Sequence, residues 1–362
     1  MSQEVIFVGA GHTNLTVLKN WKKRLPKNVS WTLFAPSRYH YYSGMFSGYI
    51  EGRYTLQDIR IDVKEFCKKN GGRFIQEKVT SIDHQRNLIL TQSGKSYKAD
   101  VAAVNIGSAP ANDFIPGVKE HALFIKPNLH FTSTAEKLRE TEYPVIVGGG
   151  HSGVEIAFAL QEWRQKHHKK TPVALVCAGS VLAEDKPEVQ EKIRALLDER
   201  GILLYEHKSV QRVDESIVYA EELKLPYGEL LWVTGSSAPP LFQFGNLPTD
   251  RNGYMEVTDT LHSLGNPSIY GSGDCVTING LEELPKNGVY AVKEAEVLEE
   301  NLIRTLKGKS KLKSFKPQKR YMAILNVGGK QGLLLRGNKY SLNKWAWRLK
   351  NKIDKRFIRQ FP

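Results

Sequence analysis

Three glycines, Gly148, Gly150 and Gly153, have the spacing of a turn that binds a dinucleotide. They form a G-x-G-x-x-G pattern directly after the apolar run 145–147. In this pattern the first glycine makes a tight turn, the second lets the backbone approach a pyrophosphate, and the third allows close packing of helix on strand. The helix that follows directs its unpaired N–H groups and its positive dipole end toward the phosphates. The pattern therefore predicts a pyrophosphate site, with Ser152 inside the same turn.

A second glycine turn of the same kind lies near the N-terminus. Gly9 and Gly11 follow the apolar run 5–8, with His12 directly after them, but Asn14 occupies the place of the third glycine. Taken alone, this incomplete pattern is not specific for a dinucleotide. Two strand-turn-helix units in one chain nevertheless indicate two nucleotide-binding halves.

Each half also has a Gly-Ser turn at the end of a later apolar strand. Gly107 and Ser108 follow the run 101–106, and Gly235 follows the run 230–234. Ligands of doubly wound α/β folds bind at the carboxyl ends of the strands, so we expect both turns to approach a ligand. An internal duplication explains the repetition more simply than coincidence.

Two strand ends have no acidic residue, although a carboxylate that binds the ribose of the nucleotide is expected there. The run 31–34 continues toward Ser37 and Arg38, and the run 173–177 continues into Ala-Gly-Ser at 178–180. A dinucleotide fold usually places Asp or Glu there to bind the adenosine ribose. In the first half we expect Ser37 or backbone groups to hold the ribose and Arg38 to contact phosphate, unless this segment is only a surface loop. In the second half, the residues do not distinguish binding of NADH from binding of NADPH.

The segment 39–45, YHYYSGM, is dense in aromatic residues for a solvated loop. Such a cluster suits packing against a flat ring system, and Ser43 and Gly44 lie inside it.

Glu155, two residues beyond Gly153, has two interpretations. Either it faces a ligand, or it is an acid that the dipole favours near the N-terminus of a helix.

An Asp at the end of another apolar strand is followed by a long helix. Gly273 and Asp274 end the run 268–272, and a helix is predicted over 289–305. An Asp beside glycines is often only a turn residue. Together, however, the two features have the arrangement of the second half of a flavin site. The carboxylate would accept hydrogen bonds from ribityl hydroxyls, and the helix N-terminus would stabilise the negative charge of a reduced flavin ring.

Composition is that of an ordinary globular protein. The chain has 362 residues, 41% hydrophobic and 25% charged, enough for two or three domains. No run approaches the roughly 18 apolar residues of a membrane span, and the N-terminus has no signal-like segment, so we expect a cytoplasmic protein. Cys67, Cys177 and Cys275 lack the spacing of a disulfide framework, a zinc site or a dithiol relay, so buried thiols and no metal site are predicted.

The C-terminal tail is a basic amphipathic segment. The last 27 residues contain nine Lys or Arg and one Asp, which is +8 of the net +14. A helix over 342–361 would place these apolar residues on one face: Leu342, Trp345, Ala346, Leu349, Ile353, Phe357 and Phe361. Such a helix suits the surface of an anionic membrane. The alternative is that it packs on the protein or on a second subunit. The sequence has no nucleic-acid-binding motif, so no nucleic acid is expected.

The predicted fold is α/β, with two Rossmann-like domains, a small antiparallel meander over 73–97 and a C-terminal extension. The first domain is discontinuous, about 1–112 and 240–310, and the second covers 113–239. The extension, 311–362, is predicted to form strands at Tyr321 to Val327 and Gly332 to Leu335 before the amphipathic helix.

Six motifs occur in an order typical of one known superfamily. They are VGAGHTN, NIGSAP, VGGGHSGVEIA, VTGSSAP, IYGSGDC and LPKNGVYAVKEAEVLEENL. Together they resemble the pyridine nucleotide-disulfide oxidoreductases, and among these the type II NADH:quinone oxidoreductase (NADH dehydrogenase-like) branch. RYHYYSGMFSGYIEG and WAWRLKNKIDKRF are similar to a subgroup also found fused to selenophosphate synthetase. The resemblance implies FAD, NADH or NADPH, hydride transfer to FAD, and transfer of two electrons to a quinone.

The resemblance also implies roles for individual residues. Glu155 matches the family glutamate near the nicotinamide and the flavin ring, and Asp274 would bind the ribityl or pyrophosphate region of FAD. The segment 286–290 would approach the pyrimidine side of the flavin, where quinone binds in family members. The predicted cofactor positions are Gly9, Gly11, His12, Asn14, Ser37, Arg38, Ser43, Gly44, Gly107, Ser108, Gly148, Gly150, Ser152, Gly153, Gly235, Gly273, Asp274, Lys286, Val289 and Tyr290.

One departure from the family pattern leaves the electron acceptor open. Quinone reductases of this branch usually have an Ala-Gln pair and a further Gln where this chain has Gly288-Val289 and Lys293. The leading prediction is a peripheral NAD(P)H:quinone oxidoreductase on the inner face of the cell membrane, and a homodimer is also allowed. The alternatives are a soluble reductase with a protein, sulfur or selenium acceptor, and an FAD-binding sensor without turnover.

Overall fold

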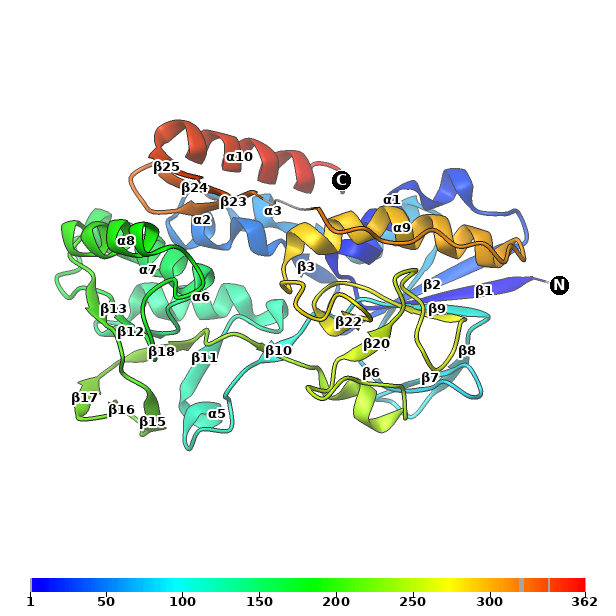
Figure 1. Cartoon of the computed structure of the whole chain (residues 1–362), viewed down its shortest axis with the longest axis horizontal. Coiled ribbons are helices and arrows are strands. Elements are labelled where there is room, and N and C mark those ends of the chain that lie inside the picture. Colours follow the sequence, from blue (N-terminus) through cyan, green and yellow to red (C-terminus); the bar gives the residue numbers. More distant parts are fainter. Residues whose placement is uncertain (1, 319–321, 338, 362) are drawn as a thin grey trace.

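Two five-stranded parallel sheets organise the chain. Their strand orders are β21-β9-β1-β2-β5 and β11-β18-β12-β13-β14. In the computed structural model, which describes residues 2–318, 322–337 and 339–361, the two sheets lie at opposite ends of an elongated molecule (Figure 1). The predicted α/β class with two Rossmann-like sheets is confirmed, whereas the domain boundaries stay a prediction.

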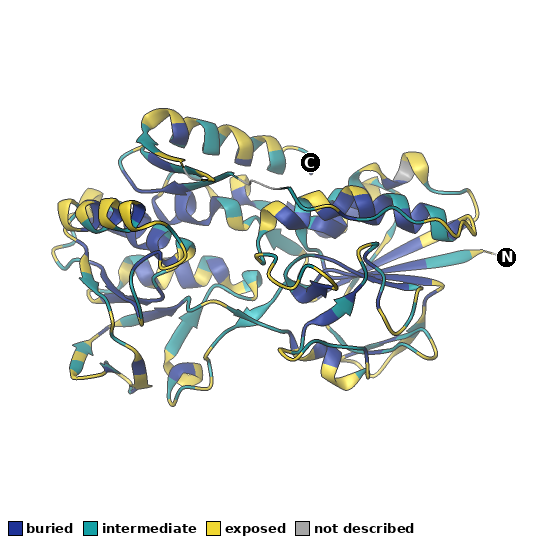
Figure 2. Cartoon of the chain, in the orientation of Figure 1, coloured by how far each residue is buried: buried dark blue, intermediate teal, exposed yellow. Residues whose placement is uncertain are grey.

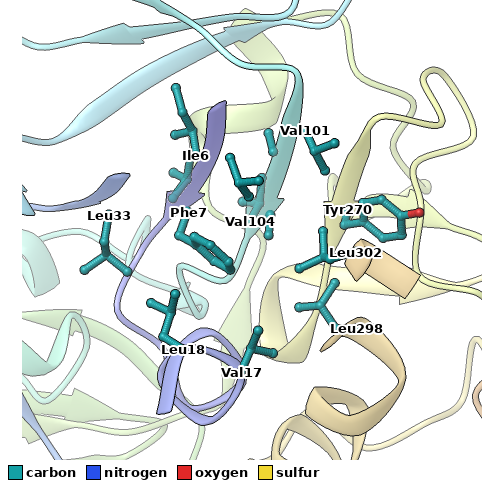
Figure 3. Packing of buried hydrophobic residues seen from close by; sticks show 14 of the residues in the cluster. Ile6, Phe7, Val17, Leu18, Leu33, Val101, Val104, Tyr270, Leu298 and Leu302 are labelled. Carbon is teal, nitrogen blue, oxygen red and sulfur yellow. The ribbon is translucent and has the colours of Figure 1, made fainter. Parts of the chain in front are cut away.

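The first sheet combines strands from both ends of the chain. Helices α1 and α9 pack on each other and on the strands. The elements are β1 (Gln3–Val8), α1 (His12–Arg24), β2 (Val29–Ala35), β5 (Arg73–Gln76), β9 (Val101–Val104), β21 (Ile269–Gly271) and α9 (Gly288–Leu306). Figure 3 shows side chains from these strands and helices in one apolar cluster, among them Ile6, Phe7, Val17, Leu18, Tyr270, Leu298 and Leu302. Burial of this cluster is the main force that fixes the helices on the sheet.

The second sheet repeats the arrangement. Helices α6, α7 and α8 contact its strands, and the meander β15–β17 covers its other face. The elements are β11 (Ala122–Phe124), α6 (Phe131–Glu140), β12 (Pro144–Val147), α7 (His151–Lys166), β13 (Ala174–Val176), α8 (Pro187–Glu199), β14 (Leu203–Tyr205), β15 (Val210–Val213), β16 (Ile217–Ala220), β17 (Leu223–Pro226) and β18 (Glu229–Trp232).

The predicted antiparallel meander over 73–97 is partly wrong. Its first strand, β5, pairs in parallel with β2 and forms the edge of the first sheet. The meander consists of β6 (Val79–Asp83), β7 (Leu88–Thr91) and β8 (Ser96–Lys98). A short apolar strand does not reveal its partner, because strands in both kinds of sheet follow similar local patterns.

The two Gly-Ser turns pair with each other. They continue into β10 (Ala109–Pro110) and β19 (Ser236–Ser237), which form a two-stranded antiparallel link. In Figure 1, β10 lies between the two sheets. The repeated turns therefore mark both crossings of the chain between the halves.

The C-terminal extension is a three-stranded sheet that carries a helix. It comprises β23 (Met322–Asn326), β24 (Gly332–Arg336), β25 (Lys339–Asn343) and α10 (Lys344–Ile358). Tyr321, where the first strand was predicted to begin, lies outside the described residues. The strand β25 was not predicted. Helix α10 lies over this sheet and over α2 (Phe46–Ile50) (Figure 1).

The predicted single apolar face of α10 needs correction. Ala346 and Phe361 are buried, but Trp345 and Ile353 are 59% and 42% exposed. Figure 2 shows the outer side of the helix exposed and its inner side partly buried. Helical periodicity identified the apolar residues but not the fact that they lie on two sides. Among the described residues, we find no helix with the length and hydropathy needed to cross a membrane.

Short elements connect these layers. They are β3 (Tyr39–Tyr41), η1 (Ser43–Met45), α3 (Leu56–Ile59), β4 (Arg60–Asp62), α4 (Val63–Lys69), α5 (Val118–His121), η2 (Asn128–His130), η3 (Pro240–Phe244), β20 (Met255–Val257), η4 (Gly273–Cys275) and β22 (Val276–Ile278). All three cysteines are free and buried, as predicted.

Candidate functional site

The carboxyl edge of the first sheet brings three predicted segments together. Val8 of β1 is in register with Val104 of β9, and Val104 is in register with Gly271 of β21. The strands therefore end side by side. As a result, the first glycine turn (residues 9–14) meets the segments 105–108 and 272–274 at one edge.

Asn105 fixes this edge, although sequence reasoning missed it. Its Oδ1 accepts the N–H of Thr13 at 3.0 Å and that of Asn14 at 3.4 Å, and its Nδ2 donates to the Ser272 carbonyl at 2.7 Å. Asn105 is 3% exposed. Its side chain therefore caps the N-terminus of α1 and ties it to the end of β21. The sequence signal was only a polar residue at the end of an apolar strand.

Three predicted cofactor glycines make room for Asn105. A Cβ on Gly9 would lie 2.4 Å from the Asn105 carbonyl oxygen, and one on Gly11 would lie 2.2 Å from Asn105 Oδ1. A Cβ on Gly273 would lie 2.6 Å from Asn105 Nδ2. Gly9 and Gly273 also have φ values of +90° and +70°, which favour glycine.

Asn14 replaces close packing by hydrogen bonds. Its Nδ2 donates to the Gly9 carbonyl at 2.9 Å and to the Ala103 carbonyl at 3.2 Å. Its Oδ1 is buried without a hydrogen-bond partner among the described residues. The side chain thus holds α1 on β1 and β9, and a contact between Asn14 and a cofactor stays a prediction.

The second glycine turn (residues 148–153) has a glycine at all three positions of the pattern. Gly148 has φ +130°, and a Cβ on Gly153 would lie 1.9 Å from the Gly148 carbonyl oxygen, so the helix α7 packs directly on the turn. A Cβ on Gly150 would meet no atom of the described residues within 4 Å. This open space beside Gly150 fits the close approach of a pyrophosphate. Ser152 is exposed, and Gly235 lies at the same edge after β18.

Glu155 lies where three parts of the molecule meet. Its Oε1 accepts the N–H of Asn326 in β23 at 2.6 Å and the hydroxyl of Ser47 in α2 at 3.4 Å. Burial raises the pKa of this carboxyl, against the opposing effects of Lys350 and the Asn326 N–H. Glu155 lies beyond the first turn of α7, which has no acidic residue, and it joins the second half to the first half and to the extension.

A charged cluster on the inner side of α10 adjoins Glu155 and was not predicted. Lys350 Nζ donates to the Gly44 carbonyl at 2.6 Å and to Asp354 Oδ2 at 3.0 Å, and Tyr42 donates to Asp354 Oδ1 at 3.1 Å. Burial works to lower the pKa of Lys350, but the carboxylates of Glu155 and Asp354 raise it. The ammonium group therefore stays charged inside the site.

The aromatic segment 39–45 packs on this helix. Tyr42 stacks on Phe357 with ring centroids 4.5 Å apart, and His12 lies 5.5 Å from His40 in a T-shaped pair. Burial lowers the pKa of His12 and lowers that of His40 to about 3, so both rings are neutral. Packing against a ligand ring stays a prediction, and the flat partner of Tyr42 in the structure is Phe357.

Ser37, predicted to hold the first ribose, and Arg38, predicted to contact phosphate, both have partners within the protein. Ser37 Oγ accepts the N–H of Tyr39 at 3.1 Å, and Arg38 Nη2 lies 2.6 Å from Asp62 Oδ2. A phosphate contact by Arg38 would therefore have to share the guanidinium with Asp62. Ser43 is exposed.

Lys126 joins two predicted cofactor positions. Its Nζ donates to Ser108 Oγ at 2.7 Å and lies 3.7 Å from Asp274 Oδ2. Lys126 follows β11 of the second sheet, whereas Ser108 and Asp274 follow strands of the first. A cation from one half thus reaches the predicted cofactor site of the other. No local pattern indicates this contact, because Asp274 is far from Lys126 in the chain.

A small hollow lies between η4 and the start of α9. It is lined in part by Asp274, Lys286, Tyr290 and Glu294. Lys286 Nζ donates to the Val276 carbonyl at 2.6 Å, and burial lowers its pKa. Burial also raises the pKa of Glu294 to about 7, and its Oε2 accepts the N–H of Gly273 at 2.5 Å. Val289 is 37% exposed.

The residues at the carboxyl edge of the first sheet fit FAD, which the first half is predicted to bind. A Cβ on Gly107 would meet no atom of the described residues within 4 Å, so space lies open beside this turn. His12 Nε2 and Ser272 Oγ are buried at the same edge without hydrogen-bond partners among those residues. Open backbone and unused polar atoms at the carboxyl edge of a parallel sheet are what a dinucleotide requires.

Comparison with known proteins agrees with this geometry. Residues 3–295 match the model of the pyridine nucleotide-disulphide oxidoreductase family. The type II NADH:quinone oxidoreductase of Staphylococcus aureus (strain MSSA476) is 24% identical over 387 residues, 98% of this chain and 95% of the relative. The NADH dehydrogenase-like protein YutJ of Bacillus subtilis (strain 168) is 24% identical over 282 residues, 76% of this chain and 77% of the relative.

Solved structures share the fold at low sequence identity. The sulfide:quinone oxidoreductase of Aquifex aeolicus has a TM-score of 0.83 at 19% identity, over 99% of this chain and 91% of the other. NDH2 from Plasmodium falciparum in complex with NADH has a TM-score of 0.79 at 17% identity, over 100% and 99%. The predicted superfamily and the resemblance to the type II branch are confirmed, and the subgroup fused to selenophosphate synthetase stays a prediction. The chain belongs to the pyridine nucleotide-disulphide oxidoreductase family.

Proposed function

We propose that the chain is an FAD-dependent oxidoreductase that takes a hydride from NADH or NADPH and passes two electrons to a quinone. The observation that carries the proposal is the position of Glu155. This carboxyl follows the second glycine turn by two residues, yet it contacts Ser47 of the first half and Asn326 of the extension. A hydride donor bound at the second turn and a hydride acceptor bound near the first turn would therefore meet beside one titratable group.

The second glycine turn is the proposed site of the pyridine nucleotide. The open space beside Gly150 admits the pyrophosphate, and the N-terminus of α7 stabilises its charge. The nicotinamide would extend from there toward Glu155, one turn along the helix. The chain's part in hydride transfer is to orient the two rings, because the step needs no general acid or base.

The first glycine turn and the two segments beside it are the proposed FAD site. The chemistry supplied by bound FAD is acceptance of a hydride and release of two electrons. Asp274 and Ser108 would accept and donate hydrogen bonds along it, and Lys126 would balance its negative charge. Asn105 holds the turn in shape without facing the ligand.

Glu155 is the proposed proton donor to the quinone. Reduction of a quinone to quinol by NAD(P)H consumes one proton besides the hydride. Oε1 already accepts hydrogen bonds from Asn326 and Ser47, which leaves Oε2 to carry the proton. Burial raises the pKa of this carboxyl, which favours a proton on it at higher pH than on an ordinary glutamate.

The outer side of α10 supports a peripheral position on the inner face of the cell membrane. Trp345 and Ile353 are exposed along one side of the helix, with exposed Lys344, Arg348 and Lys352 beside them. An apolar stripe between basic residues fits an anionic lipid surface, where a lipid quinone is dissolved.

The second candidate is a reductase with a protein, sulfur or selenium acceptor. The start of α9 favours it, because Val289 and Lys293 replace the glutamines typical of quinone reductases in this branch, and both are exposed. Neither supplies the amide that would hold a quinone carbonyl.

Steady-state oxidation of NADH and NADPH with menaquinone and ubiquinone analogues tests the proposal. Quinone-dependent turnover is expected, and Glu155→Gln should lower kcat with quinone by about 100-fold while leaving flavin reduction nearly unchanged. Glu188→Gln, an exposed acid in the first turn of α8, is the matched control. Flavin reduction without reoxidation by any quinone would favour the second candidate, and no flavin reduction at all would favour a sensor.

A further inference from the structure

The adenosine end of the second half has a buried thiol where an acid is usual. Strand β13 ends at Val176, and Cys177 follows it at 1% exposure. A Cβ on Gly149 would lie 2.5 Å from Cys177 Sγ, so the thiol points beneath the glycine turn. This position therefore offers no carboxylate to the two hydroxyls of an unmodified ribose.

Two acids close to Ser180 and His207 in the sequence already have internal partners. Glu206 accepts the N–H of Val181 at 2.7 Å and lies 2.7 Å from Arg194 Nε. Asp185 Oδ2 lies 2.8 Å from His151 Nε2. A phosphate at this edge would therefore meet little uncompensated negative charge from these two acids.

The turn after β13 presents donors instead. Ser180 Oγ lies 3.5 Å from His207 Nε2, and His207 is exposed. Backbone hydrogen bonds from His207 to the Gly179 carbonyl and from Lys208 to the Cys177 carbonyl hold the two segments together. A Cβ on Gly179 would meet no atom within 4 Å in the part of the chain that the structure describes, so the space above the turn is open.

We propose that this turn binds the 2′-phosphate of NADPH, with Ser180 and His207 as donors to the phosphate oxygens. The inference rests on the proposed binding of a pyridine nucleotide at the second glycine turn, and it names NADPH as the preferred donor. A hydroxyl and an imidazole N–H both donate to phosphate, and the open backbone at Gly179 lets the anion approach. NADH would leave these donors without their partner.

The test uses fragments that carry only the adenosine end. The purified holoprotein is titrated calorimetrically with adenosine 2′,5′-bisphosphate and with 5′-AMP. The bisphosphate is expected to bind about a hundredfold more tightly, because each of the two charge-assisted hydrogen bonds contributes about tenfold. His207→Ala should remove about tenfold of affinity for the bisphosphate and leave 5′-AMP unchanged.

Two further variants sharpen the result. His168 is exposed at the far end of α7 and has the same φ of +54° as His207, so His168→Ala controls for backbone strain and should change neither affinity. Ser180→Asp restores an acid near the strand end, and it should reverse the preference in favour of 5′-AMP. Equal affinities of the wild type for the two fragments, or an unchanged preference in Ser180→Asp, would overturn the inference.

Failure here is distinguishable from failure of the proposed function. A protein that prefers the bisphosphate but reduces no quinone upholds the phosphate site and contradicts the quinone reductase. A protein that reduces quinone with NADH and binds both fragments equally does the reverse.

Discussion

The two glycine turns share a sequence pattern but are closed by different means. In the first turn, Asn105 and Asn14 fill the space with amide groups and hold α1 by hydrogen bonds. In the second turn, Gly153 brings α7 directly onto the Gly148 carbonyl, and the space beside Gly150 stays open. The same strand-turn-helix unit can therefore be fastened either by a side chain from a neighbouring strand or by direct helix-strand contact.

The central glycines of the two turns give the sharpest test. Gly11 and Gly150 have nearly the same backbone conformation, with φ of −71° and −75°. Gly11→Ala would force a methyl group to 2.2 Å from Asn105 Oδ1, so it should lower the free energy of unfolding by about 3 kcal/mol. Gly150→Ala should change it by less than about 0.5 kcal/mol, but weaken NADH binding by about tenfold.

Chemical denaturation and calorimetric titration of the two variants measure these differences. Equal losses of stability would mean that the turns are fastened alike, and the comparison would then be wrong.

The Asn105 side chain is the next largest expected effect. Asn105→Ala leaves the N–H of Thr13 and the Ser272 carbonyl without their partner, which should lower the free energy of unfolding by about 2 kcal/mol. Asn105→Asp keeps the acceptor for Thr13 but places a carboxylate against the Ser272 carbonyl, so it should not restore stability. An Asp variant as stable as the wild type would show that the bond to Ser272 contributes nothing.

The carboxyls beside the two turns should respond to pH with opposite signs. Burial raises the pKa of Glu294 to about 7. Burial works in the same direction on Glu206, but the hydrogen bonds from Arg194 and Val181 lower its pKa. A folded-state pKa above the unfolded value favours folding at low pH, and this contribution is lost as the pH rises through about 7. Glu294→Gln should therefore gain about 3 kcal/mol over the wild type near pH 8, and nothing near pH 4.

Unfolding free energies measured across this pH range test the sign for Glu294. A gain that is the same at both ends would contradict the titration of Glu294. Stability that Glu206 contributes should instead be lost as the pH falls through its lowered pKa.

The smallest effect on stability is expected outside both turns, on the outer side of α10. Trp345→Gln with Ile353→Gln removes exposed apolar side chains and should change the free energy of unfolding by less than about 0.5 kcal/mol. Sedimentation with anionic vesicles should nevertheless fall strongly. Sedimentation at the wild-type level would rule out this stripe as the membrane contact.

Local patterns in the sequence predicted most of the fold and both turns. Apolar runs bounded by glycines located β1, β9, β12 and β21, because buried parallel strands are continuous in hydropathy. Local patterns could not predict that β5 pairs with β2 or that β10 pairs with β19, because a strand's own residues do not identify its partner. Nor could they predict the contacts of Asn105 and Lys126, whose partners lie far along the chain or in the other half.

The C-terminal helix shows the same limit. Its periodicity indicated one apolar face, but α10 places Lys350 and Asp354 against the site and exposes Trp345. The pair of Lys350 and Asp354 can be buried because each side chain has a further hydrogen-bond partner. Helical spacing alone does not reveal such partners.

The absorption spectrum of the purified protein tests the central claim most directly. We predict a yellow protein whose flavin bands bleach when NADPH or NADH is added without oxygen. A colourless protein that takes up no added FAD would contradict the assignment of the first turn and, with it, the proposed reaction.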